Sequence, residues 1–224
     1  MDIHKPKPWH GWREFLKEYV IIVVGVLTAL GAEQGVERLH VLGEVSEARA
    51  ALHAEISRQM RSLTLEAQEN ACWPAKLDAF EAWARGEAPK PKPQGALMQS
   101  LSETAWETAR TGAVTHMGLE ERLALANFYD GIENQRPQIH EVRLKSVALR
   151  GYLEREALDP EEAHALIRLI GETRGNVSGE TRNVSGMLDR ARKLGVEPAP
   201  PVPEYEARVD DFCAAFPPKS AEGR

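Results

Sequence analysis

The sequence predicts an all-α protein, in which an N-terminal transmembrane helix continues into a long stalk helix and is followed by a helical bundle domain. Three observations support this prediction. An uncharged apolar run lies near the N-terminus, blocks such as EARAALHAEI repeat the helix-favouring residues Ala, Leu, Glu and Arg, and only 6% of the 224 residues are aromatic. With 42% hydrophobic and 28% charged residues, the chain can form a core and keep a solvated surface.

The apolar run is the candidate membrane anchor. It contains about 14 residues and would rise about 21 Å as a helix, whereas a bilayer core is about 30 Å thick. Its flanks extend it, because Trp9 and Trp12 share a helical face suited to the membrane interface and the Lys17 side chain can reach the headgroups. We therefore predict a short basic cytoplasmic segment at 1–17 and a transmembrane helix at 18–35, with the lipid bilayer as partner.

The distribution of basic residues predicts the orientation of this helix. Four Lys or Arg residues precede the apolar run and two follow it closely, so the positive-inside rule places the N-terminus in the cytoplasm. The rest of the chain would then be extracytoplasmic, anchored in the inner (cytoplasmic) membrane. Two other interpretations remain open: a cleaved signal peptide with Ala29 and Gly31 near the cut, and the buried helix of a soluble protein. Glu14 and Glu18 in the basic region weigh against cleavage.

Small residues recur within and just after the apolar run. Gly25 and Ala29 are four residues apart, and Gly31 and Gly35 repeat the spacing. Such spacing lets two helices approach closely in lipid, which predicts helix–helix packing in a homo-oligomer. The alternative is that glycine and alanine are simply common in membrane helices.

Residues 36–72 are predicted to form a stalk helix that continues from the membrane span. No proline interrupts the chain between Trp9 and Cys72. Apolar residues recur there at three-, four- and seven-residue steps, which is the pattern of one stripe on an amphipathic helix. The stripe consists of Leu42, Val45, Leu52, Ile56, Met60 and Leu63.

A helical bundle domain is predicted for residues 73–197. Proline is favoured in the first turn of a helix, so Pro74 and Pro137 each predict a new helix. The strongest start signal is the segment DPEE at 159–162, which combines an N-cap residue, a proline at the first helical position and acidic residues in the first turn. We expect this last long helix to run to about Leu194.

An imperfect repeat, GETRGNVS followed by GETRNVSG, places glycines in the middle of that helix. Gly171, Gly175 and Gly179 fall on every fourth residue, and each costs about 1 kcal/mol relative to alanine in a helix interior. Either the helix breaks here, or a neighbouring helix packs against the bare backbone. We favour an intact or kinked helix.

Residues 198–224 are predicted to form a proline linker, a short helix that docks on the bundle, and a loose tail. The short helix carries Cys213, and the only other cysteine is Cys72 at the end of the stalk. In an oxidising compartment the two form a candidate disulfide, which would tie the C-terminal helix to the stalk. Two unpaired thiols are the alternative.

The sequence carries none of the short motifs that indicate a catalytic, metal or cofactor site. The seven histidines do not form the spacings of a zinc hydrolase, and no phosphate loop, dinucleotide-binding fingerprint or nucleophile elbow is present. Carboxylates occur in runs typical of solvated helix faces. Trp106 could form the floor of a ligand pocket, but an aromatic residue at helical spacing is typical of a core. We predict no catalytic residue, no metal and no cofactor, and the net charge of −6 disfavours nucleic acid.

Two segments carry a family resemblance. One is WREFLKEYVIIVVGVLTALGAEQ followed by a charged helix, and the other is TAWETARTGAVTHM followed by a helix ending in ANFYDGI. In these segments the chain resembles a family of uncharacterised bacterial single-pass inner-membrane proteins with an N-terminal anchor and a helical extracytoplasmic domain. The resemblance implies the same layout, and it implies no functional residue because the activity of the family is undefined.

Three classes of function follow from these observations. The first expectation is a membrane-anchored, non-enzymatic interaction or assembly protein, self-associating or bound to another membrane or extracytoplasmic protein. The second is an extracytoplasmic ligand-binding module that works through a membrane partner. An enzyme is the least supported. An exposed apolar stripe at 42–63 would favour the first class, an apolar pocket with convergent polar groups near Trp106 the second, and clustered buried carboxylates or histidines the third.

Overall fold

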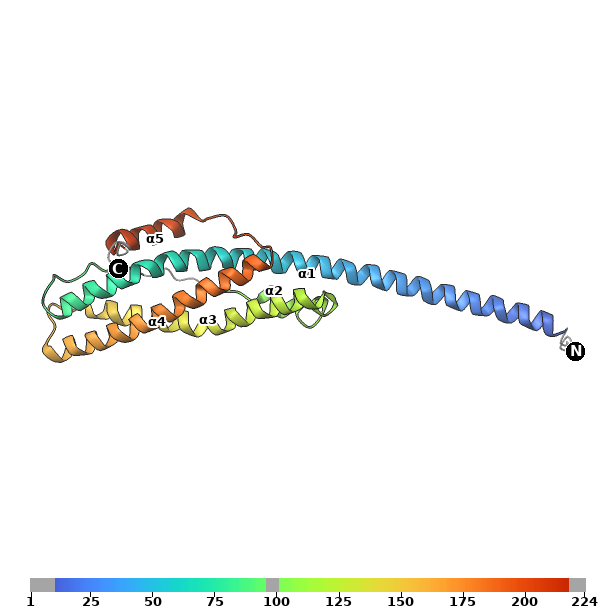
Figure 1. Ribbon diagram of the computed structural model, residues 1–224, viewed down its shortest axis with the longest axis horizontal. Coiled ribbons are helices and arrows are strands. Elements are labelled where there is room, and N and C mark those ends of the chain that lie inside the picture. The colour runs from blue at the N-terminus through green and yellow to red at the C-terminus, as the bar shows by residue number, and fades with distance from the viewer. Residues whose placement is uncertain (1–10, 96–100, 218–224) are drawn as a thin grey trace, which may run out of the picture. The chain divides into compact units, whose positions relative to one another are not determined.

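The computed structural model describes residues 11–95 and 101–217, and these ranges contain helices and no strand, which confirms the all-α fold class (Figure 1). The chain divides into two units, Met1–Glu47 and Ala48–Arg224, and the division falls inside the first helix. The helices are α1 (Trp12–Ala84), α2 (Thr104–Ala109), the 3-10 helix η1 (Ala113–His116), α3 (Leu119–Tyr152), α4 (Pro160–Lys193) and α5 (Pro203–Ala215).

The first unit consists, in its described part, of the N-terminal half of α1. From Trp12 to Leu42 its large apolar side chains are mostly exposed, with Ile21 70% and Leu27 63% exposed, whereas Val45 is buried. Exposed apolar surface is unfavourable in water, so this stretch suits a lipid environment. By length and composition α1 can cross a membrane, and none of its most apolar window is buried. Trp12 and Lys17 are exposed at its start, whereas Trp9 lies outside the described residues.

The second unit begins at Ala48, so the later part of the predicted stalk, residues 48–72, belongs to the bundle. Leu52, Ile56 and Leu63 are fully buried there. Leu42, in the first unit, is 65% exposed. Most of the apolar stripe is therefore core of the bundle and offers no surface to a second protein.

Pro74 and Pro137 lie inside α1 and α3, so the two helix starts predicted from these prolines are wrong. A proline inside a helix removes one backbone hydrogen bond and costs about 3 kcal/mol. Tertiary packing outweighs this cost, because Trp73 and Leu77 on either side of Pro74 are each 1% exposed. The local preference of proline predicted a helix boundary at this position. The burial of the flanking side chains keeps the helix continuous instead.

Helix α4 begins as its sequence predicts. Asp159 accepts a hydrogen bond from the Glu162 amide at 2.8 Å, and Glu162 accepts one from the Asp159 amide at 3.2 Å, which forms a capping box. The helix then continues unbroken through the repeated glycines. No atom lies within 4 Å of a Cβ position at Gly171 or Gly175, so no neighbouring helix packs against their backbone.

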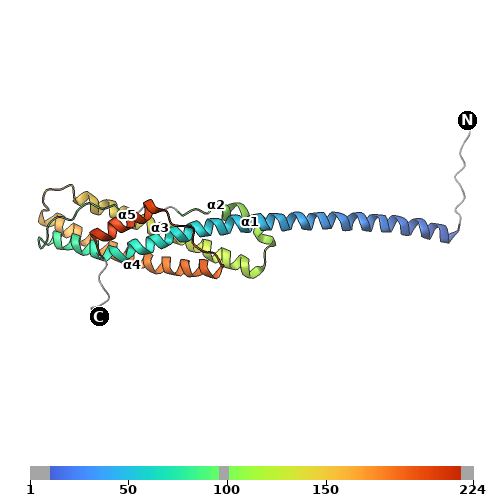
Figure 2. The same ribbon diagram turned by 90° about the horizontal axis from the view of Figure 1, so that it is seen from above.

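Three long helical segments form the bundle of the second unit: the part of α1 after Ala48, α3 and α4. Helix α3 runs in the same direction as α1 and α4 runs back (Figures 1 and 2). Side chains from these helices and from α5 share one core. It includes Cys72, Trp73, Leu77, Phe80, Val142, Leu149, Leu166, Ile170, Val177, Phe212 and Phe216.

A disulfide between Cys72 of α1 and Cys213 of α5 fixes the C-terminal helix to the bundle. The two Cα atoms are 5.3 Å apart, although 141 positions separate the residues in the chain. Next to the bond, the rings of Trp73 and Phe212 lie 5.7 Å apart between centroids. The linker before α5 also contacts α1, because the Ala199 amide donates to the Ser57 carbonyl at 2.8 Å. The predicted loose tail lies largely outside the described residues, which end at 217.

Candidate functional site

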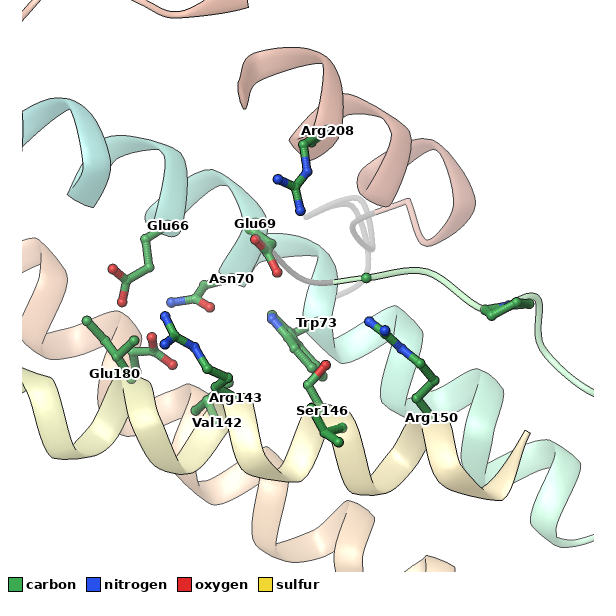
Figure 3. Close-up of a pocket in the computed structure, with 14 residues that line it drawn as sticks. Glu66, Glu69, Asn70, Trp73, Val142, Arg143, Ser146, Arg150, Glu180 and Arg208 are labelled. Carbon is green, nitrogen blue, oxygen red and sulfur yellow. The ribbon is translucent and has the colours of Figure 1, made fainter. Parts of the chain in front are cut away.

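A pocket of about 440 Å³ lies within the second unit, among α1, α3, α4 and α5 (Figure 3). Its volume is in the range of small-molecule sites in proteins. The lining is rich in charged and polar side chains: Glu66, Glu69, Asn70 and Trp73 from α1, Arg143, Ser146 and Arg150 from α3, Glu180 from α4 and Arg208 from α5.

Helical spacing explains why these residues meet. Glu66, Asn70 and Trp73 follow one another at steps of four and three residues, so they share one face of α1. Ser146 and Arg150 are four residues apart on α3 and face them across the pocket (Figure 3). Two helices thus present polar residues to each other in the interior of the bundle.

Glu66 and Glu180 form a buried carboxyl pair at one end of the pocket. They are 8% and 3% exposed, and two carboxyl groups in contact at a buried site favour a state in which the pair holds a proton. Burial, together with the nearby charge of Glu66, raises the pKa of Glu180 to about 10, so Glu180 holds the proton at neutral pH. Burial also raises the pKa of Glu66, while hydrogen bonds from Glu180 and Gln135 and the charge of Arg143 oppose that rise.

Asn70 lies beside this pair and leaves one donor group unused. The residue is 5% exposed, and its Nδ2 has no hydrogen-bond partner among the described residues. Its amide projects from α1 into the pocket, toward Arg143 and the carboxyl pair (Figure 3). An unsatisfied buried donor costs about 1–3 kcal/mol, so the site favours an added group that accepts a hydrogen bond.

Basic side chains surround the other end of the pocket. Arg150 and Arg208 are exposed at its rim, and their guanidinium groups make no hydrogen bond or ion pair with any residue in the described ranges. Beside the pocket, Lys76 is 3% exposed, and its Nζ lies 4.2 Å from the centroid of the Trp73 ring. Burial lowers the pKa of Lys76 to about 8, and the charge of Glu69 opposes this shift.

A second buried carboxylate, Glu55, lies elsewhere on α1 and is fully bonded. It accepts hydrogen bonds from the Tyr129 hydroxyl at 2.9 Å, the Ser102 hydroxyl at 3.1 Å and the Ala105 amide at 3.0 Å. Trp106 stacks on Tyr129, with ring centroids 4.8 Å apart and planes within 7°. Trp106 therefore packs against the bundle, and the pocket forms around Trp73 instead.

The other residues singled out in the sequence lie apart from this pocket. Gly25, Ala29, Gly31 and Gly35 are all on the exposed first half of α1, and the Cβ positions of the three glycines have no atom within 4 Å. Cys72 and Cys213 are joined by the disulfide. Among the described residues, no group of three or more His, Cys, Asp or Glu side chains is placed to hold a metal ion.

Sequence reasoning missed Glu66, Asn70 and Glu180, although a signal was present. Core positions of α1 alternate by four and three residues from Leu52 to Phe80, and Glu66 and Asn70 occupy two of them. Glu180 occupies such a position between Val177 and Val184 of α4. A polar residue in a core position of this repeat predicts a buried polar group, whereas the sequence analysis assigned carboxylates to solvated faces.

Comparisons with known proteins give one partial similarity. Over 152 residues the chain is 30% identical to a glutamyl-tRNA reductase of Sorangium cellulosum (strain So ce56), and this alignment covers 62% of the chain and 26% of that protein. The chain therefore spans about a quarter of the length of the curated relative it matches. No protein-family model matches the chain, and no solved structure is significantly similar to it.

Proposed function

We propose that this chain is a membrane-anchored, non-enzymatic binding protein. Its span at 18–35 would hold the N-terminus in the cytoplasm and the helical unit outside the inner membrane, where the polar pocket would recognise a small ligand and act through a membrane partner. The observation that carries the proposal is the pocket itself, with the buried, unpartnered Nδ2 of Asn70 inside it. Most buried polar groups in proteins are hydrogen-bonded, so an unused donor inside a pocket is a candidate binding group.

Two features support the extracytoplasmic placement. Basic residues are concentrated before the apolar run, as expected for a cytoplasmic N-terminus. The Cys72–Cys213 disulfide belongs to the second unit, and disulfides persist in oxidising compartments outside the cytoplasm.

Binding is a better account of the pocket than catalysis. The clustered carboxyl groups are a feature that an enzyme could use, but Glu66 and Glu180 lie against each other and Gln135 donates to Glu66 at 3.4 Å. Reduction of a tRNA-linked substrate, suggested by the name of the relative, is not part of the proposal. The match covers 26% of that protein, and a net charge of −6 disfavours nucleic acid.

Self-association through the membrane helix is a second candidate, which the open surface around Gly25, Gly31 and Gly35 favours. In lipid, helices associate closely where small residues remove side-chain bulk. The double variant Gly25→Leu/Gly31→Leu should then lower the dimer fraction seen by cross-linking in membranes. Val24→Leu, at an exposed neighbouring position, is the matched control. An unchanged dimer fraction in the double variant would exclude this interface.

The placement is tested by fusing reporters to the C-terminus. An alkaline phosphatase fusion should be active and a fluorescent protein that matures only in the cytoplasm should be dark. The reverse pattern would overturn the topology.

The binding role is tested by filling the pocket from an exposed position. Val147 lines the pocket and is 58% exposed, so Val147→Trp should block it and still fold. Leu144→Trp, also exposed on α3 and outside the pocket lining, is the control. Against a panel of amino acids, carboxylic acids, phosphates and amines, at least one class should raise the melting temperature of the full chain and of Leu144→Trp but not of Val147→Trp. Equal shifts in both variants would exclude this pocket.

A further inference from the structure

We infer that the ligand of this pocket is a small anion whose carboxylate or phosphate group binds the guanidinium groups of Arg150 and Arg208 at the rim, while another acceptor atom of the ligand reaches the Asn70 amide. The inference rests on the proposed binding function and adds the chemical class of the ligand. Three properties of the pocket support it: the kind of hydrogen-bonding group left unused, the balance of charges, and the shape of the basic side chains.

Three lining atoms in the buried part of the pocket have no hydrogen-bond partner among the described residues: the donor Asn70 Nδ2, and Glu66 Oε2 and Glu180 Oε2. A proton held by the carboxyl pair can join the two oxygens to each other, which leaves the donor for a ligand. Asn70 Nδ2 carries two hydrogens and accepts nothing, so only an acceptor atom on the ligand can satisfy it. Carboxylate and phosphate oxygens are strong acceptors. An ammonium ligand would bring more donors to this position and leave Nδ2 unsatisfied.

The charges that line the pocket leave an excess of positive charge at neutral pH. Three arginines line it, and Glu66 and Glu69 oppose them while Glu180 keeps its proton. Lys76 lies just outside the lining, against the Trp73 ring. An anion would therefore enter a net positive site.

Arg150 and Arg208 have the geometry for such an anion. A guanidinium group presents a planar fork of donors that matches two oxygens of a carboxylate or phosphate. Arg150 comes from α3 and Arg208 from α5, so the two side chains approach the pocket from different helices (Figure 3). Neither guanidinium group is engaged by another described residue, so both are available to a ligand.

The test uses the full chain in detergent micelles at pH 7 and three probes: succinate, inorganic phosphate and putrescine, each compared with sodium chloride at equal ionic strength. Succinate, phosphate or both should raise the melting temperature by a few degrees, because a ligand that binds only the folded state stabilises it. The difference between the two anions tells a carboxylate ligand from a phosphate ligand.

Substitutions test whether the anion stabilises the protein by binding in this pocket. Arg150→Gln/Arg208→Gln should weaken anion affinity at least tenfold, whereas Arg168→Gln/Arg182→Gln, with the same loss of charge at exposed sites of α4 outside the pocket, should not. Asn70→Leu should melt at a higher temperature than the wild type without ligand and yet respond less to the anion. A purely structural asparagine would not produce this opposite pair of effects.

Several outcomes would overturn the inference. It fails if neither anion raises the melting temperature more than sodium chloride does. It also fails if the two double variants lose the same amount of anion affinity. A shift with putrescine alone, lost in Val147→Trp, would reject an anionic ligand and keep the binding pocket. Shifts that persist in Val147→Trp would reject both the inference and the proposed function.

Discussion

Two buried carboxyl sites on the same helix differ in how completely they are bonded. Glu55 and Glu66 are separated by 11 residues, about three turns of α1, so they lie on the same side of the helix. Glu55 receives three hydrogen bonds, from a tyrosine, a serine and a backbone amide. Around Glu66, the pair with Glu180 holds one proton, and Asn70 keeps an unpartnered donor.

The difference separates a fully bonded structural site from the pocket for which we propose a binding role. At Glu55 the three donors come from α2, the segment before it and α3, so the carboxylate holds these segments on α1. At Glu66 the polar groups line a pocket and are not all satisfied, which a stability role alone does not require. Perturbing each site should therefore have different consequences.

Replacing Glu55 should give the largest effect. Glu55→Leu leaves three donors without an acceptor, and at about 1–3 kcal/mol for each buried donor we expect a loss of about 4 kcal/mol in the free energy of unfolding. Urea denaturation followed by circular dichroism measures it. Glu180→Leu, which removes a neutral buried acid, should change stability by about 1 kcal/mol or less. Equal losses in the free energy of unfolding for the two variants would contradict the difference drawn between the two sites.

Removing the disulfide comes next. Cys72→Ala/Cys213→Ala should lower the free energy of unfolding by about 3 kcal/mol, because the bond closes a long loop. Helix α5 carries Arg208, so the pocket should lose ligand affinity, whereas the Glu55 site contains no α5 residue and should keep Trp106 stacked on Tyr129. Near-ultraviolet circular dichroism reports on the stacked Trp106 and Tyr129 rings, and limited proteolysis reports on the attachment of α5. A pocket unaffected by loss of the bond would argue against a role for Arg208.

A pH dependence should distinguish the carboxyl pair. Unfolded Glu180 loses its proton near 4.5 and folded Glu180 keeps it to a pKa of about 10, so the folded state binds more protons between these values. Stability should therefore fall as pH rises from 5.5 to 7.5, by about 2.7 kcal/mol, a range that lies below the lowered pKa of Lys76. Glu180→Gln should flatten this slope. A wild-type curve already as flat as that of Glu180→Gln would mean that the pair holds no extra proton.

We expect the smallest effect from a glycine substitution in α4, the helix that carries Glu180. Gly175 is one of the exposed helical glycines with open space around it, so Gly175→Ala should stabilise the protein by about 0.7 kcal/mol through helix propensity. Gly131→Ala in α3 is the contrasting variant, because its methyl group would come within 2.7 Å of Arg190 and force that side chain to move. Thermal melts should show a gain for the first and a smaller gain or none for the second.

Local signals in the sequence were sufficient for the all-α class and for the start of α4, and insufficient for two other helix boundaries and for the pocket. The capping residues at 159–162 placed the start of α4 because they act within one turn. Pro74 and Pro137 misled because their cost is local, whereas the burial that overrides it comes from other helices. The pocket requires knowing that Asn70 of α1 meets Glu180 of α4, and nothing in the spacing of either helix specifies that pairing.

The bond between Cys72 and Cys213 also determines how the molecule would carry mechanical tension. A pull between the N-terminal end of α1 and the C-terminal end of α5 would pass directly from one helix to the other through the two sulfur atoms. Helices α3 and α4 lie between the cysteines in the chain and would form a loop outside the path of the force. Arg150 and Glu180 could keep their positions while the ends of the protein are under load.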